Sequence, residues 1–241
     1  MVQLTTRERV DAFWSNTFDL STADLRLPGV RVRPHTPSRA SWRAVYVLSF
    51  DDAACVLAPA DLVSVLSDAL AGRAAGEVLD PSGWRALFDG STLRTVVATR
   101  HHYLDDRGGL AEFAVGRRVN PRDHSALASL RSAIPPLEWE QAGFGLQPAM
   151  MFGVFEGEEM VGAATLGAGP DAATDIGVVV RPRIRGKGYG TQVTATAAKQ
   201  AVLMHGIARF RTPADSEASL ALARRLGFTE YGCDLTVHLS R

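Results

Sequence analysis

A glycine-rich turn between an apolar strand and an apolar helix is the feature that constrains this sequence most. Residues 176–180 are apolar and mostly β-branched, which predicts a buried strand. Glycines then occupy every second position, at Gly186, Gly188 and Gly190. The helix expected behind them has one apolar stripe, made of Val193, Ala197, Ala201 and Met204, and Gly206 is placed to end it. Because the first amides of a helix lack backbone acceptors and glycine allows close approach, this arrangement predicts an anion-binding site.

The spacing of the glycines shows which of the known phosphate-binding motifs this loop can match. A P-loop requires Ser or Thr after its lysine, whereas Lys187 is followed by Gly188. The dinucleotide-binding pattern G-x-G-x-x-G is not matched either, because the loop reads G-x-G-x-G. The loop fits Arg/Gln-x-x-Gly-x-Gly/Ala through Arg185, Gly188 and Gly190, and residues 219–228 read SLALARRLGF. Together with the flanking strand and helix, this loop resembles the pyrophosphate loop of the GNAT superfamily of N-acetyltransferases, and residues 219–228 resemble that family's closing helix and corner.

Composition excludes several function classes. The 241 residues carry 26 basic and 26 acidic side chains, so net charge gives no support to binding of nucleic acid or of a membrane surface. No apolar run is long enough to span a bilayer, and the N-terminus lacks a secretory segment. Cys55 and Cys233 are too few for a disulfide framework or a metal site. We therefore expect a cytoplasmic protein, a monomer or a homodimer, without a metal.

The resemblance covers about residues 110–241 and implies an α/β fold with a mixed sheet, the GNAT acyl-CoA N-acyltransferase fold. Residues 1–109 are expected to form a smaller α+β N-terminal lobe of unassigned type, with the seam at residues 107–109. In the lobe we expect a helix at 5–18, a hairpin of 42–50 and 53–57, a helix opened by Pro59, a short helix or turn at 84–88 and a strand at 93–98.

The remaining elements follow the family's order. We expect, in chain order, a strand at 113–119, a helix begun by Asn120, a short helical piece at 137–144, a hairpin of 151–155 and 160–166, a strand at 175–180, the helix after the glycine loop, a strand at 208–212, a helix at 216–226 and a strand at 228–239.

The resemblance implies acetyl-CoA as co-substrate and direct attack by a primary amine of a small molecule or protein. Backbone groups of the strand would pair with the pantetheine arm, and the loop amides would bind the pyrophosphate. The residues implied to bind the cofactor are Val178, Val179, Val180, Arg185, Gly186, Lys187, Gly188, Tyr189, Gly190, Thr191 and Ser216. Ser216 stands where related sequences often carry Asn.

Three carboxylates are candidates for the catalytic base. Asp175 enters the central strand, where it is either the base or a strand-edge residue facing solvent. Glu138 and Glu140 flank Trp139 in the piece expected to overhang the acceptor. Being two residues apart they do not share a helix face, so we expect one of them in the site, as a base or as a binding group for a cationic acceptor.

One departure from the family pattern leaves a second function open. Many members carry a tyrosine five residues before the phenylalanine of the corner, and this chain has Ala223 there. The usual general acid is therefore missing, and the alternative to an enzyme is a non-catalytic acetyl-CoA-binding sensor or regulatory module.

The His101-His102 pair resembles half of a metal site, but no third ligand is spaced nearby.

Overall fold

The computed structural model describes residues 5–88, 93–145, 148–167 and 175–240. The chain divides into two compact units. The first contains residues 1–101, 213–215 and 230–241, and the second contains residues 102–212 and 216–229. Residues 230–241, expected in the GNAT half, therefore belong to the first unit, and the domain boundary at residue 109 stays a prediction. No helix within the four described ranges is long and apolar enough to cross a membrane.

The first unit is a sheet with helices packed on it. Its strands are β1 (Gly29–Pro34), β2 (Ala44–Phe50), β3 (Ala53–Ala58) and β10 (Thr229–Leu239), in the order β1-β3-β2-β10. β3 is parallel to β1, whereas β2 is antiparallel to both β3 and β10. Its helices are α1 (Thr6–Phe18), α2 (Thr22–Leu25), α3 (Val63–Leu70) and α4 (Pro81–Leu87). Trp14 of α1 stacks on Tyr46 of β2, while Leu66 of α3 and Trp84 of α4 pack with Val47 of the same strand in another cluster.

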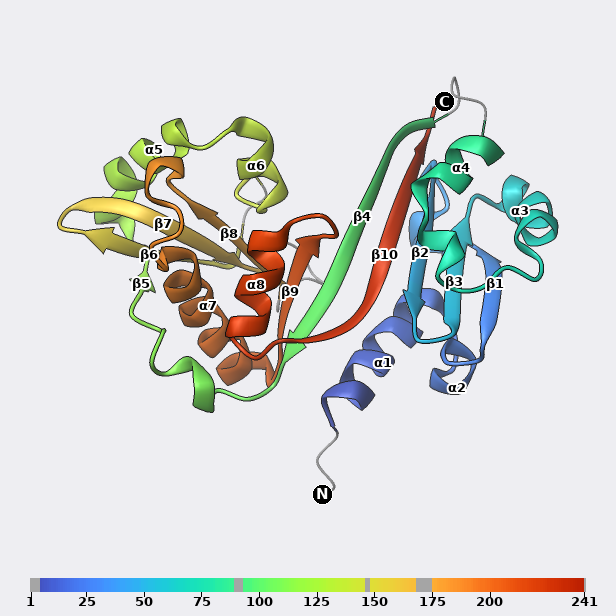
Figure 1. Ribbon diagram of the computed structural model, residues 1–241, viewed down its shortest axis with the longest axis horizontal. Coiled ribbons are helices and arrows are strands. Elements are labelled where there is room, and N and C mark those ends of the chain that lie inside the picture. Colours follow the sequence, from blue (N-terminus) through green and yellow to red (C-terminus); the bar gives the residue numbers. More distant parts are fainter. Residues whose placement is uncertain (1–4, 89–92, 146–147, 168–174, 241) are drawn as a thin grey trace. The chain divides into compact units, whose positions relative to one another are not determined.

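The second unit contains a mixed sheet. Strand β4 (Leu93–Leu104) begins in the first unit and ends in the second. It is followed by β5 (Arg117–Arg118), β6 (Met150–Glu156), β7 (Glu159–Leu166), β8 (Asp175–Val180) and β9 (Ala208–Pro213). The order β9-β8-β7-β6-β5 is antiparallel except for β8 and β9, which are parallel. The helices are α5 (His124–Ala133), α6 (Pro136–Gln141), α7 (Tyr189–His205) and α8 (Glu217–Arg225) (Figure 1).

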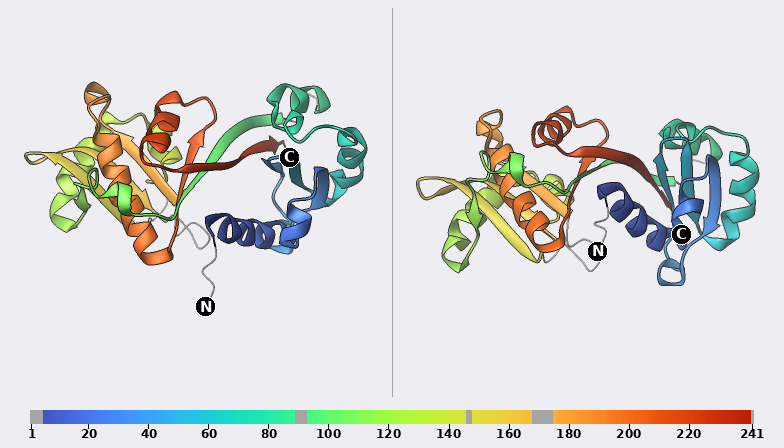
Figure 2. Two further views of the ribbon diagram at one scale, coloured as in Figure 1. Left: turned by 60° about the horizontal axis from the view of Figure 1, so that its bottom comes forward. Right: turned by 90° about the horizontal axis from the view of Figure 1, so that it is seen from below.

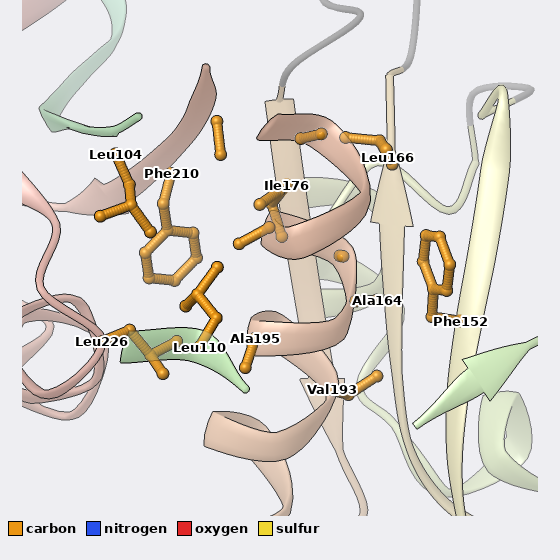
Figure 3. Close-up of a cluster of buried hydrophobic side chains, with 14 of the residues drawn as sticks. Leu104, Leu110, Phe152, Ala164, Leu166, Ile176, Val193, Ala195, Phe210 and Leu226 are labelled. Atoms are coloured by element: carbon orange, nitrogen blue, oxygen red, sulfur yellow. The ribbon is translucent and has the colours of Figure 1, made fainter. Parts of the chain in front are cut away.

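Two hydrophobic clusters hold the helices of the second unit to its sheet. Helix α7 packs on β6, β7 and β8 through small residues such as Ala197 and Ala201, both without solvent exposure. In Figure 3 the Phe210 ring of β9 lies near Leu104, Leu110 and Leu226 of the same cluster. Helices α5 and α6 pack on β7 and β8 through a separate cluster that includes Trp139. Figure 2 shows the backbone of these elements from two further directions. The sheet is thus buried on both faces where β7 and β8 lie.

Most expected elements are confirmed, and the exceptions have local causes. The strand expected at 113–119 is reduced to β5, because the chain turns at Leu110, whose carbonyl accepts the amides of Phe113 and Ala114. β1 is an additional strand that the sequence analysis does not predict. The predicted apolar stripe of α7 is wrong at its end: the side chain of Met204 is 51% exposed because the buried face of the helix stops at Val202.

Candidate functional site

Strand β8 has one edge that is only partly covered. Its register with β7 covers five residue pairs, from Gly162–Val180 to Leu166–Ile176. Its register with β9 covers two pairs, Asp175–Arg209 and Ile176–Phe210. Within the described residues, the part of β8 after Ile176 therefore has no β9 partner. The two parallel strands separate there and leave backbone groups available to another extended molecule.

The directions of neighbouring hydrogen bonds show which groups face this open edge. The amide of Gly177 donates to the Thr165 hydroxyl at 3.2 Å, and the amide of Arg181 donates to the Val161 carbonyl at 3.0 Å. Both therefore point toward β7. Because successive residues of a strand alternate, the N–H and C=O groups of Val178 and Val180 point away from β7. Val179 points back, and its side chain is buried against α5 and α6.

The glycine loop forms the second part of the site. Gly186 and Gly188 have φ angles of +81° and +89°, which other residues adopt only with strain. Gly188 is the N-cap of α7, and no side chain caps this helix. The first intrahelical bond runs from the amide of Gln192 to the carbonyl of Gly188 at 3.1 Å. Among the described contacts, the amides of residues 186–191 have no acceptor, so the helix dipole and free N–H groups make an anion site.

The side chains of the loop residues have structural contacts. Tyr189 donates its hydroxyl to the carboxylate of Glu156 at the end of β6, and Thr191 is buried. A β-carbon at Gly190 would lie 3.3 Å from the side chain of Leu222 in α8, so a small residue allows the two helices to pack closely. Tyr189, Gly190 and Thr191 can therefore contribute backbone amides to an anion, while the side chains of Tyr189 and Thr191 fix the start of α7.

Positive charge surrounds the loop, but one arginine is engaged elsewhere. Arg183 and Lys187 are exposed and make no ion pair with any described residue. The Arg185 guanidinium donates through Nε to the Val180 carbonyl at 3.1 Å, and its Nη2 lies 2.6 and 2.8 Å from the two carboxylate oxygens of Glu138. Arg185 is thus folded onto β8 and α6. Sequence spacing gives no sign of this pair, because its members are 47 residues apart.

Helix α6 is fixed to β8 and brings only one of its two glutamates to the loop. Trp139 is buried against Phe144, with ring centroids 4.3 Å apart. The Thr165 hydroxyl donates to the Ala142 carbonyl at 2.9 Å. A β-carbon at Gly177 would come within 1.9 Å of that carbonyl, so only glycine permits the contact. Glu138 reaches Arg185, as described above, while Glu140 is exposed without an ion pair among the described residues.

Asp175 lies at the closed end of the open edge and is paired with two arginines. Its carboxylate contacts Arg209 of β9 through both oxygens, with Nη2 2.7 Å from Oδ2, and Arg211 Nε lies 3.4 Å from Oδ2. The side chains of Asp175 and Arg209 are only 15% and 8% exposed. Burial lowers the pKa of Arg209, but the charge of Asp175 and the contact with Tyr103 outweigh it and raise that pKa above its ordinary value. Asp175 therefore does not face solvent as a free strand-edge carboxylate.

The start of α8 and its buried face complete the region. Ser216 is the N-cap residue of α8, and its hydroxyl contacts the Ser219 hydroxyl at 3.0 Å without capping a backbone amide. Ala223 is fully buried in the cluster that joins α7 and α8 to the sheet. No group of three or more His, Cys, Asp or Glu side chains that could hold a metal occurs in the described ranges.

Comparison with known proteins supplies the family. Residues 112–228 match the model of the acetyltransferase (GNAT) family. This segment is a GNAT acetyltransferase domain. The GNAT fold expected from the sequence, a mixed α/β sheet, is confirmed. Membership in the family implies an acyl-CoA-dependent N-acyltransferase, and the open edge and the glycine loop both lie inside the matched segment.

Several solved structures are similar to this chain at low sequence identity. An acetyltransferase of the GNAT family from Colwellia psychrerythraea is 16% identical, with 65% of this chain and 61% of that chain covered and a TM-score of 0.47. A conserved protein of unknown function from Staphylococcus epidermidis is 12% identical, with 66% of each chain covered and a TM-score of 0.49. A GCN5-related N-acetyltransferase-like protein from Streptococcus suis is 14% identical, with 82% and 84% covered and a TM-score of 0.44. A search of curated proteins finds no match.

Proposed function

We propose that this protein is an N-acetyltransferase that transfers the acetyl group of acetyl-CoA to a primary amine of a small molecule or a protein. The observation that carries the proposal is the combination of an open edge on β8 with an uncapped helix N-terminus at the end of the same strand. A pantetheine arm is extended and carries amide groups, so it suits the groups of Val178 and Val180 that point away from β7. The pyrophosphate suits the free amides of residues 186–191, with Lys187 adding positive charge.

The chemistry that this arrangement supports is direct attack. The amine nitrogen forms a bond to the acetyl carbon, the carbon–sulfur bond breaks, and the CoA thiolate leaves while the amine gives up a proton to a base. We assign the amide of Val178 to the oxygen of the tetrahedral intermediate, because it faces the open edge close to the point where β8 and β9 separate. A preorganised donor of this kind contributes about 3 kcal/mol of transition-state stabilisation.

The contacts of the three carboxylates suggest how their roles divide. Asp175 is held by Arg209 and Arg211 at a largely buried position, so its carboxylate is already committed to ion pairs. We therefore assign Asp175 to holding β8 and β9 together below the open edge. Glu138 and Glu140 lie on α6, whose end at Ala142 is docked on Thr165 of β7 and Gly177 of β8, and we assign the acceptor side of the site to this helix.

A non-catalytic acetyl-CoA-binding module is the second candidate. It is favoured by Ala223, which leaves no hydroxyl at a position fully buried in the core, and by the ion pair that occupies Asp175. Both candidates require the same cofactor loop, so acetyl-CoA binding alone does not separate them. Turnover does.

The experiment that tests the proposal has two parts. Isothermal titration calorimetry measures binding of acetyl-CoA, and release of the CoA thiol is followed with a panel of primary amines, including polyamines, aminoglycosides and peptide N-termini. We expect binding and amine-dependent thiol release. Binding without any amine-dependent release supports the sensor, and absence of binding contradicts both candidates.

We place the protein in the cytoplasm, as a monomer or homodimer, and size-exclusion chromatography with light scattering measures its mass.

A further inference from the structure

The Glu138–Arg185 ion pair joins the acceptor-side helix to the cofactor loop. Arg185 Nη2 lies 2.6 and 2.8 Å from the two oxygens of Glu138, and the side chains are 48% and 34% exposed. An ion pair this exposed exchanges partners readily with other ions, because water screens it and compensates each charge when it separates. It therefore links two parts of the site without fixing them permanently.

Arg185 also occupies part of the open edge. Its Nε donates to the Val180 carbonyl at 3.1 Å, one of the groups that point away from β7. An extended amide-containing ligand that pairs with Val178 and Val180 needs the same carbonyl as an acceptor. In this position the guanidinium covers one binding group of the open edge and directs its charge at Glu138 instead of at the helix N-terminus.

The neighbouring charges show that this arrangement is particular to Arg185. Arg181, four residues earlier, pairs with Glu159 of β7 at 3.0 Å and donates to the Ser129 hydroxyl, away from the glycine loop. Arg183 and Lys187 make no ion pair with a described residue. Arg185 is thus the arginine of this segment that contacts both the open edge and α6.

We propose that the Glu138–Arg185 ion pair is a latch that acyl-CoA must open, so that cofactor binding turns Arg185 toward the pyrophosphate and frees the Glu138 carboxylate for the acceptor amine. This inference rests on the proposed function. A pyrophosphate carries more charge than one carboxylate and adds hydrogen bonds to the free amides of α7, so it outcompetes Glu138 for the guanidinium. The latch makes the acyl-CoA affinity lower than the open site would have, since part of the binding free energy opens the pair.

Release of Glu138 leaves α6 in place. The helix keeps its other contacts, the buried Trp139 and the hydrogen bond from Thr165 to Ala142. Only the carboxylate changes partner, from a fixed guanidinium to an arriving ammonium group. The latch therefore imposes an order, in which acyl-CoA binds before the amine. It also explains how one carboxylate can belong to both the cofactor side and the acceptor side of the site.

The first test measures the acetyl-CoA Kd by calorimetry in four variants of the full chain. Glu138→Gln removes the partner of Arg185, and we expect a Kd about two- to fivefold lower than in the wild type, the change that one exposed ion pair produces. Glu159→Gln is the matched control, because it removes the same charge from the partner of Arg181, and its Kd should equal that of the wild type. Arg185→Gln supplies the background in which Glu138→Gln should have no further effect.

The second test follows the carboxylate itself. Carbodiimide labelling with mass spectrometry compares Glu138 and Glu159 with and without acetyl-CoA, and labelling of Glu138 alone should rise. An unchanged or higher Kd in Glu138→Gln, an equal gain in Glu159→Gln, or a gain that persists in the Arg185→Gln background each overturns the latch while the proposed function stands. Absence of acetyl-CoA binding in the wild type overturns the proposed function, and the latch with it.

Discussion

Asp175 and Arg209 are register partners in β8 and β9, and their side chains pair one register position before the last described pair, Ile176–Phe210, after which the strands separate. The pair is largely buried, with Nη2 of Arg209 2.7 Å from Oδ2 of Asp175. Two charges held this way fix the distance between the strands at the closed end of the open edge. The opening that the proposed pantetheine site needs thus begins one register pair beyond this ion pair.

Removing one partner of this pair should destabilise the fold. Asp175→Asn leaves the Arg209 guanidinium buried without its counter-charge, and we expect a loss of about 3 kcal/mol in the free energy of unfolding. Urea unfolding at neutral pH measures it. The exposed Arg43–Asp61 pair is the control, and Asp61→Asn should change the free energy by less than about 0.5 kcal/mol. An Asp175→Asn protein of wild-type stability whose kcat falls about 10²–10⁴-fold would identify Asp175 as the base instead.

The cofactor loop gives a second prediction, at Gly188. An added β-carbon there meets no atom within 4 Å, so Gly188→Ala puts a methyl group into the open space over the loop and strains a backbone with φ of +89°. We expect a loss of about 1–2 kcal/mol in stability and an acetyl-CoA Kd about tenfold higher. Gly72→Ala is the matched control, since Gly72 has φ of +73° and equally open surroundings in the first unit. It should lose stability alone, and an unchanged Kd in Gly188→Ala would contradict the assignment of the loop.

The local parts of this site were predictable from sequence. A β-branched run, alternating glycines and a helical apolar stripe specify a strand, a turn and a helix within about thirty residues, and each depends on neighbours along the chain. Asn120 likewise predicted the start of a helix, and both halves of a capping box are present at the 3-10 turn Pro121–Asp123 that leads into α5. Such signals depend only on residues close together in the sequence, so these elements can be predicted without knowing the tertiary contacts.

The contacts that set the chemistry were not predictable in the same way. Asp175 and Arg209 are 34 residues apart, with all of α7 between them, and only the register of a parallel pair brings them together. The membership of β10 in the first unit was not predictable for the same reason, because it depends on strand pairing between residues far apart in the sequence. Alternation of Leu235, Val237 and Leu239 predicts a half-buried strand, but nothing in that pattern names its partner β2.

A third prediction concerns acid stability. Hydrogen bonds from Arg117, with Nη2 2.6 Å from Oδ1, and from the Asn120 amide lower the pKa of Asp123 to about 2. In the unfolded chain an aspartate has a pKa of about 3.9. The stabilisation is therefore complete above about pH 4 and is lost as the pH falls through about 2. Urea midpoints between these pH values should fall less steeply in Asp123→Asn than in the wild type.

A second variant, measured in the same pH series, tests the cause of the lowered Asp123 pKa. Arg117→Gln removes the first cause of the lowered pKa while keeping the carboxyl group, so its midpoints should also fall less steeply than those of the wild type. Curves of all three proteins that run parallel from pH 4 to pH 2 would show that this carboxylate does not contribute to acid unfolding.

The fourth prediction follows from the place of β10. A fragment of residues 102–241 retains β10 but lacks β2, against which Leu235 and Val237 are buried. We expect this fragment to aggregate, because it exposes an apolar strand with unpaired backbone groups. The fragment 102–229 omits β10 and should be the more soluble of the two on sedimentation. A soluble, monomeric 102–241 fragment with full activity would show that β10 does not need the first unit.

The fifth prediction is that no tyrosine acts as the general acid. The chain has four, Tyr46, Tyr103, Tyr189 and Tyr231. Tyr46 donates to Asp234 at 2.9 Å, Tyr189 donates to Glu156, Tyr231 donates to Asp11, and Tyr103 contacts Arg209. Each hydroxyl is thus engaged by a structural partner, and Ala223 supplies none.

Physical chemistry indicates that such an acid is dispensable here. A thiolate leaves with a pKa of about 8.5, so water can protonate it afterwards, whereas an alkylammonium acceptor holds its proton until about pH 10. The rate should therefore rise with pH as the acceptor is deprotonated, without an alkaline limb that belongs to a phenol. Each tyrosine is changed to Phe, and kcat is measured at saturating acetyl-CoA across pH. We expect changes well below the 10²–10⁴-fold that general acid catalysis typically contributes. A fall of that size in one variant, with its fold and acetyl-CoA Kd intact, would identify that tyrosine as the acid.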